Sequence, residues 1–118
     1  MAVKKTSTIQ LKVGLDDQQI PVRIDWSAQN GEQPPTGKEA KAFLVSIFEK
    51  DSRDTLKMDL WVKDMQVNEM DRFFFQTLRG MADTYFKATQ NKELATAMQQ
   101  FVNYFGEETK LLDKTNSK

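Results

Sequence analysis

Residues 55–105 read TLKMDLWVKDMQVNEMDRFFFQTLRGMADTYFKATQNKELATAMQQFVNYF, and this stretch decides the fold. It begins with alternating apolar and polar residues, the two-residue period of a strand with one buried face. It then changes to apolar residues three and four positions apart, the period of an amphipathic helix. Eight of the twelve aromatic residues of the chain lie between Phe73 and Phe105. The sequence therefore predicts that helix faces build most of the core in the second half.

Two helices are expected, at about 67–90 and 92–106. Asn68 is the candidate N-cap of the first helix, and Gly106 is the candidate C-cap of the second. Gly80 lies inside the first helix, where glycine costs about 1 kcal/mol relative to alanine. Close approach of another helix or chain would explain a glycine at this position.

Four strands are expected before the helices. The first runs from Ser7 to Leu15, and the second alternates from Ile20 to Trp26. The two should form a hairpin with Leu15 opposite Ile20 and Ile9 near Trp26. Pro21 lacks an amide donor, so the second strand should begin near it.

The segment 27–38, SAQNGEQPPTGK, is rich in proline, glycine and polar turn formers, which predicts a loop. The third strand is expected at 43–48, apolar on both faces, and the fourth at 55–63. The residues predicted to face the core are Ile9, Leu11, Val13, Val22, Ile24, Trp26, Leu56, Met58, Leu60, Phe74, Leu78, Met81, Phe101 and Phe105.

The length of 118 residues fits one domain. The predicted fold is α+β, a four-stranded, mainly antiparallel sheet with two C-terminal helices packed on one face. Residues 1–6 and 114–118 are expected to be flexible ends of this single domain.

The composition excludes several kinds of chemistry. There is no cysteine and no histidine, which removes disulfides, thiolate metal sites, cysteine nucleophiles and the usual general base. Seventeen basic and seventeen acidic residues cancel, so no nucleic-acid footprint is present. The chain shows neither a signal peptide nor a membrane span, and we expect a cytoplasmic protein without cofactor or metal.

The remaining candidate sites have simpler explanations. Asp16 with Asp17, and Asp51 with Asp54, lie in expected loops, where carboxylates serve more often as turn residues than as cation ligands. Phenylalanines 73–75 at helical spacing favour plain core over a ligand pocket. No catalytic residue is predicted.

Trp61 is unusual because its neighbours on the same strand face are charged. A four-residue loop that pairs Lys50 with Thr55 would set the register of the last two strands. Leu44 and Phe48 would then share the outer face with Trp61, unless the 27–38 loop or the N-terminal arm covers it. The opposed pairs in this register are Leu44 with Trp61 and Phe48 with Lys57.

An exposed apolar patch of this kind usually marks a contact surface. We expect it to bind a second copy of the chain or another protein, with a symmetric dimer formed by face-to-face packing of two sheets. The predicted interaction residues are Leu44, Phe48, Lys57, Asp59, Trp61 and Lys63.

The segment Thr55–Met70, which includes Asp59, Trp61 and Glu69, resembles the gliding-motility protein GldC family of Bacteroidetes. The likeness continues through FFFQTLRGMADTYFKATQ and KELATAMQQFVNYFGE. The N-terminal part also fits, with a strand, the pair Asp16 and Asp17, then Pro21 and the run Trp26, Ser27 and Ala28. The resemblance therefore covers nearly the whole chain.

The resemblance implies a small soluble accessory protein of movement over surfaces, without enzymatic activity, whose partner is a protein of the gliding machinery. The chain departs from the family where relatives often carry histidine in place of Phe75 and proline in place of Gln66. An antiparallel sheet followed by two helices also looks like the export chaperone SecB at the level of fold, so a holdase for unfolded polypeptide is the alternative. A small-molecule enzyme would need a cavity with convergent polar groups, and the sequence indicates none.

Overall fold

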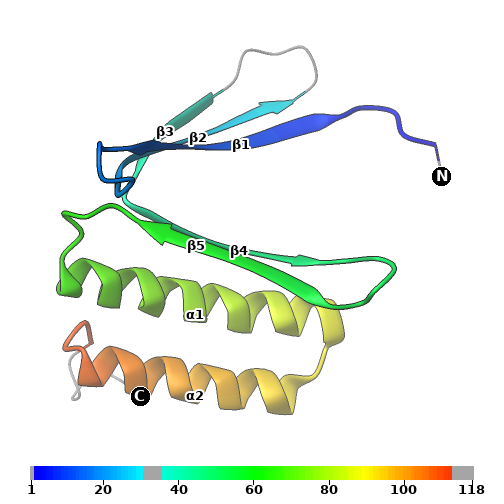
Figure 1. The fold of residues 1–118 in the computed structure, drawn as a ribbon. Coiled ribbons are helices and arrows are strands. Elements are labelled where there is room, and N and C mark those ends of the chain that lie inside the picture. Colours follow the sequence, from blue (N-terminus) through cyan, green and yellow to red (C-terminus); the bar gives the residue numbers. More distant parts are fainter. Residues whose placement is uncertain (1, 31–35, 113–118) are drawn as a thin grey trace. The chain divides into compact units, whose positions relative to one another are not determined.

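A computed structural model of the protein describes residues 2–30 and 36–112 of the chain. The chain forms two compact units, Met1–Met65 and Gln66–Lys118. The described residues of the first unit form five strands and those of the second form two helices (Figure 1). The α+β class and the two C-terminal helices are thereby confirmed. The single domain and the packing of the helices on one sheet face stay predictions.

The strands form two antiparallel sheets instead of the predicted four-stranded one. In the first, β2 (Pro21–Asn30) lies between β1 (Ser7–Leu15) and β3 (Thr36–Ala40). The second is a hairpin of β4 (Ala42–Phe48) and β5 (Thr55–Trp61). The prediction of one sheet is wrong because the chain bends at Lys41, directly after β3, and β4 leaves the first sheet.

The predicted loop at 27–38 is also wrong. β2 continues to Asn30 and β3 begins at Thr36, while the central part of the segment, 31–35, lies outside the described residues. β3 has the sequence TGKEA, which lacks apolar alternation, so pairing with β2 is what makes it a strand. A side chain at Gly37 would collide with the Trp26 carbonyl, which explains a glycine at this close approach.

The first hairpin pairs two residues away from the predicted register. Leu11 lies opposite Trp26 and Ile9 lies opposite Ala28. A register irregularity between Gly14 and Leu15 then places Leu15 opposite Pro21. Because the shift is even from Ser7 to Gly14, the side chains of these pairs keep their predicted face, whereas the irregularity takes Leu15 out of this alternation. β2 begins at Pro21 itself and is the central strand of its sheet.

The buried core of the first unit is small. Ile24 is fully buried and Val62, just after β5, is 3% exposed. Most of the other strand residues predicted to be inward are exposed. Pairing joins the strands along their edges and leaves the two faces of each sheet open. The exposed residues of the predicted core in this unit are Ile9, Leu11, Val22, Trp26, Leu56, Met58 and Leu60, and Val13 is half-buried.

The helices α1 (Val67–Thr89) and α2 (Lys92–Glu108) lie side by side and form a hairpin (Figure 1). The N-cap of α1 is Gln66 and not Asn68, and the amide of Gln66 donates to the Glu69 carboxylate at 2.9 Å. Gln90 ends α1 in the left-handed conformation. Asn91 then caps α2 by accepting from the amide of Leu94 at 3.1 Å.

The residues buried at the seam between the helices are not those predicted to face the core. Phe75 and Ala82 of α1 are buried, as are Val102 and Gly106 of α2. Their spacings of seven and four residues place each pair on one face. The small residues set this seam because they let the helices approach closely. Of the helix residues predicted to be inward, Phe74, Met81 and Phe101 are exposed, whereas Leu78 and Phe105 are half-buried.

Neither helical glycine has its expected role. Gly106 does not end α2, which continues to Glu108 with Thr109 as C-cap. A Cβ at Gly106 would lie 2.6 Å from a Leu112 methyl carbon and 2.7 Å from the Phe75 ring. A Cβ at Gly80 would meet no atom of the described helical unit within 4 Å. Close approach therefore occurs at Gly106.

A matched pair of glycine substitutions tests this packing. Gly80→Ala should raise the free energy of unfolding by about 0.5–1 kcal/mol, because alanine favours the helix and meets no steric obstacle. Gly106→Ala should lower it by about 1 kcal/mol or more, because the new methyl group crowds Phe75 and Leu112. Urea unfolding followed by circular dichroism measures both. Equal effects of the two substitutions would contradict the seam.

Candidate functional site

The loop between β4 and β5 sets the register of the hairpin that carries the predicted interaction residues. The amide of Glu49 donates to the Asp54 carbonyl at 3.0 Å, and the amide of Arg53 donates to the Glu49 carbonyl at 3.0 Å. Arg53 takes a left-handed conformation with φ of 59°. The Ser52 hydroxyl adds a bond of 2.6 Å to the Glu49 carboxylate. The loop is therefore closed by Glu49 and Asp54.

The register that follows differs from the predicted one by two residues. Phe48 lies opposite Thr55, Leu44 opposite Asp59, and Ala42 opposite Trp61. The predicted pairs of Leu44 with Trp61 and Phe48 with Lys57 are therefore wrong. The shift is again even, so the predicted residues of β4 and β5 still share one face.

We call this surface the tryptophan face. It carries the side chains of Ala42, Leu44, Ser46, Phe48, Thr55, Lys57, Asp59 and Trp61. The opposite surface, the methionine face, is wholly apolar. It carries the side chains of Phe43, Val45, Ile47, Leu56, Met58 and Leu60.

The apolar residues of the tryptophan face do not form one continuous patch. Trp61 is 53% exposed and has the half-buried Leu44 as its diagonal neighbour. Phe48 is 67% exposed but lies at the other end of the hairpin, about 20 Å from Trp61 along the strands. Lys57 and Asp59 stand between them and form an ion pair with each other. The predicted charged rim is thus the centre of this face.

Lys63 leaves the predicted site altogether. β5 ends at Trp61, and the amide of Lys63 donates to the Pro21 carbonyl at 3.0 Å. The Lys63 ammonium lies 3.1 Å from the Asp16 carboxylate in the loop between β1 and β2. Lys63 therefore connects the two sheets of the first unit.

Asp16 organises that loop, as expected of a turn residue. One carboxylate oxygen accepts from the amides of Gln18 at 2.9 Å and Ile20 at 3.0 Å, and the other faces Lys63. The amide of Ile20 does most to lower the pKa of Asp16 below its ordinary value. The amide of Gln18 and the Lys63 ammonium add to this effect, and partial desolvation opposes it. Sequence reasoning did not find the link to Lys63, because no pattern relates residues so far apart.

The charged face of the first sheet is internally paired. Arg23 donates to both oxygens of Asp25, at 2.8 and 3.0 Å, and lies 3.3 Å from Glu39. The hydrogen bond from Arg23 lowers the pKa of Asp25, and the same bond raises that of Arg23. Asp25 and Glu39 are also cross-strand neighbours. This arrangement is typical of a solvated charge ladder.

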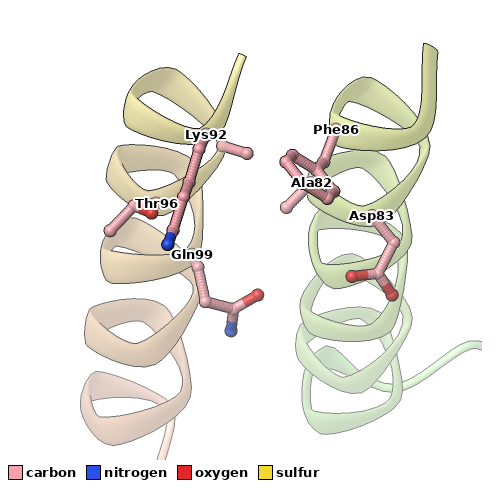
Figure 2. Close-up of a pocket in the computed structure, with 7 residues that line it drawn as sticks. Ala82, Asp83, Phe86, Lys92, Thr96 and Gln99 are labelled. Carbon is pink, nitrogen blue, oxygen red and sulfur yellow. The ribbon is translucent and has the colours of Figure 1, made fainter. Parts of the chain in front are cut away.

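An open groove of about 260 Å³ lies between α1 and α2 (Figure 2). Ala82 and Phe86 face it from α1, and Lys92 and Gln99 face it from α2. Ala82 of α1 and Ala95 of α2 also line it. The groove offers single charges on opposite walls and no converging set of polar groups, so it indicates no ligand site.

Within 2–30 and 36–112, no group of three or more carboxylates is placed to hold a metal ion. Neither described helix is long and apolar enough to cross a membrane.

The comparisons identify the family of the chain. A family model described as gliding motility-associated protein GldC-like matches residues 21–111, and the chain belongs to this family. The resemblance seen in the sequence is thereby confirmed. No curated protein and no solved structure matches the chain.

The lowered pKa of Asp16 predicts a pH dependence. A carboxylate with a lowered pKa in the folded state stabilises the protein above its unfolded pKa of about 3.9, and this contribution is lost as the pH falls through the folded value. Asp16→Asn should therefore reduce stability at pH 7 and flatten its decline in acid. Thermal unfolding at several pH values measures the effect, with Asp17→Asn as the neighbouring control. An unchanged acid profile in Asp16→Asn would show that the amides of Ile20 and Gln18 and the Lys63 ammonium do not stabilise the Asp16 carboxylate.

Proposed function

We propose that this member of the GldC-like family acts in gliding motility as a non-enzymatic protein that binds a protein of the gliding machinery through the tryptophan face. The family match supports the process. The binding role is supported by the lack of histidine and cysteine and by carboxylates engaged in turns and ion pairs.

The exposure of Trp61 is the observation that carries this proposal. Tryptophan is large and mostly buried in folded proteins, yet this one is more than half exposed on a two-stranded hairpin. Leu44 beside it extends the apolar area. Tryptophan is also enriched among the residues that dominate binding energy. Trp61 is therefore the anchor of the proposed surface.

The charges beside Trp61 suit a binding surface. Lys57 and Asp59 neutralise each other, and Lys57 is exposed to solvent while Asp59 is half-buried. An exposed ion pair contributes about 0–1 kcal/mol, so a partner can replace it with little loss. The proposed surface thus joins an apolar anchor to two charges of opposite sign that fix the orientation of the partner.

A holdase for unfolded polypeptide is the second candidate, and the methionine face favours it. Its side chains are all apolar, and Ile47, Leu56, Met58 and Leu60 are exposed. Flexible methionine surfaces adapt to varied apolar sequences. A holdase would bind many unfolded chains through this surface, whereas a dedicated accessory protein would bind one folded partner through Trp61.

A pull-down from gliding cells tests the proposal. Trp61→Ala should weaken capture of the specific partner by about 2 kcal/mol or more, because the apolar anchor is lost. Tyr104→Ala removes a similarly exposed aromatic side chain from α2 and should have no effect. Circular dichroism verifies that both variants are folded.

A second measurement separates the two candidates. Binding of a reduced, unfolded protein should be weak if the dedicated role holds. Strong binding that survives Trp61→Ala and is lost in Met58→Lys would instead support the holdase. Equal recovery of partners by wild type and Trp61→Ala would show that the tryptophan face does not bind the partner.

A further inference from the structure

The outer edge of β5 has backbone groups available for pairing. Among the described residues, β5 pairs with β4 alone. The amide of Val62 donates to the Lys41 carbonyl at 2.8 Å, and the amide of Glu49 donates to the Asp54 carbonyl at 3.0 Å. Antiparallel strands alternate between residues that bond to the partner and residues that do not. Even-numbered residues of β5 therefore bond to β4.

The odd-numbered residues of β5 direct their amides and carbonyls away from β4. These residues are Thr55, Lys57, Asp59 and Trp61. Just beyond them, the next odd-numbered residue, Lys63, donates its amide to the Pro21 carbonyl, so the start of β2 meets this side of the chain after Trp61. The edge from Thr55 to Trp61 is the part that remains as a template for one more strand.

We infer that this edge pairs with the same edge of a second copy, antiparallel, about a two-fold axis at Met58. The segment Leu56-Lys57-Met58-Asp59-Leu60 is self-complementary about its centre. Antiparallel pairing centred on Met58 places Lys57 opposite Asp59 of the partner subunit and Asp59 opposite Lys57 of the partner subunit. Opposite charges directly across a strand pair stabilise it, and any other register loses this match.

The same pairing also brings compatible side chains of the two copies opposite each other on both faces of the hairpin. On the methionine face, Leu56 lies opposite Leu60 of the partner subunit, so an apolar surface continues across the axis. On the tryptophan face, Trp61 lies opposite Thr55 of the partner subunit. The strand beyond carries Phe48 of the partner subunit in the same row, about 10 Å from Trp61. The aromatic residues that one copy holds apart are brought near each other by two.

The outer edge of β4 lacks the feature that selects β5. The residues of β4 that face away from β5 are Ala42, Leu44, Ser46 and Phe48, none of which is charged. If β4 paired with β4 of a second copy, no pair of opposite charges would select one register. Two strands alone are marginal, and pairing through β5 makes a four-stranded sheet from two hairpins. The self-complementary edge thus favours edge-to-edge association over the face-to-face dimer expected from the sequence.

Charge reversal with mixing tests the pairing. Lys57→Asp and Asp59→Lys each place like charges across the axis, so each should weaken the dimer at least about tenfold in Kd. An equimolar mixture of the two variants should form heterodimers, because each chain then meets the opposite charge. The intrachain ion pair is absent from both variants, so recovery in the mixture reports contact between chains. Sedimentation equilibrium measures all four samples, wild type included.

Cross-linking places the axis. Met58→Cys should form an intersubunit disulfide on mild oxidation, because the two side chains face each other in a closely spaced pair and the chain has no other cysteine. Val45→Cys lies on the same face but one strand away, and should not cross-link. Circular dichroism of every variant separates misfolding from lost association.

Several outcomes would overturn the inference. They are a monomeric wild type at roughly 100 µM, well above the Kd of a specific complex, mixed variants that stay apart, or a disulfide in Val45→Cys and not in Met58→Cys. None of these bears on the pull-down through Trp61, so the two proposals can fail separately.

Discussion

The register of β4 against β5 is the constraint on which the functional surfaces depend. The loop closed by Glu49 and Asp54 fixes it, with Arg53 in a left-handed turn. This register brings Lys57 and Asp59 to the centre of the tryptophan face and leaves Trp61 at one end. It also decides which residues of β5 bond to β4 and which turn to the outer edge. A loop one residue longer would change both properties together.

Much of the fold could be predicted because periodicity is local. The alternation of Ser7–Leu15 and Thr55–Trp61 and the spacing of α1 and α2 gave nearly the observed elements. β3 was missed because its residues, TGKEA, are held by pairing with β2 and not by an apolar pattern. The division into two sheets was also missed, because the chain bends at Lys41 without a proline or glycine that would indicate a turn in the sequence.

The sequence predicted which residues share the strand face of Trp61, but it did not predict which of them are neighbours on that face. An alternating strand fixes the face of Trp61, whereas the neighbours across the hairpin depend on where the loop closes. Both predicted registers differed by two residues, so Leu44 and Phe48 remained on the same face as Trp61 while their distances changed. Lys63 was assigned to the rim because it follows the strand pattern, but the strand ends before it and its ammonium pairs with Asp16. The helix seam shows the same limit, because periodicity allowed several apolar faces and small residues at Ala82 and Gly106 selected one.

The residues of β5 divide two tasks between side chain and backbone. Thr55, Lys57, Asp59 and Trp61 present their side chains on the tryptophan face and their amides at the outer edge. Backbone pairing is nearly indifferent to side-chain identity, so the two charges must supply the register of the edge. Trp61 lies at the end of this segment, where it adds apolar area without disturbing the charge match at the centre. The seven residues of β5 can therefore carry both a charge-matched edge for a second copy and an aromatic anchor on one face. A dimer of this GldC-like chain would present two Trp61 side chains at once to a protein of the gliding machinery.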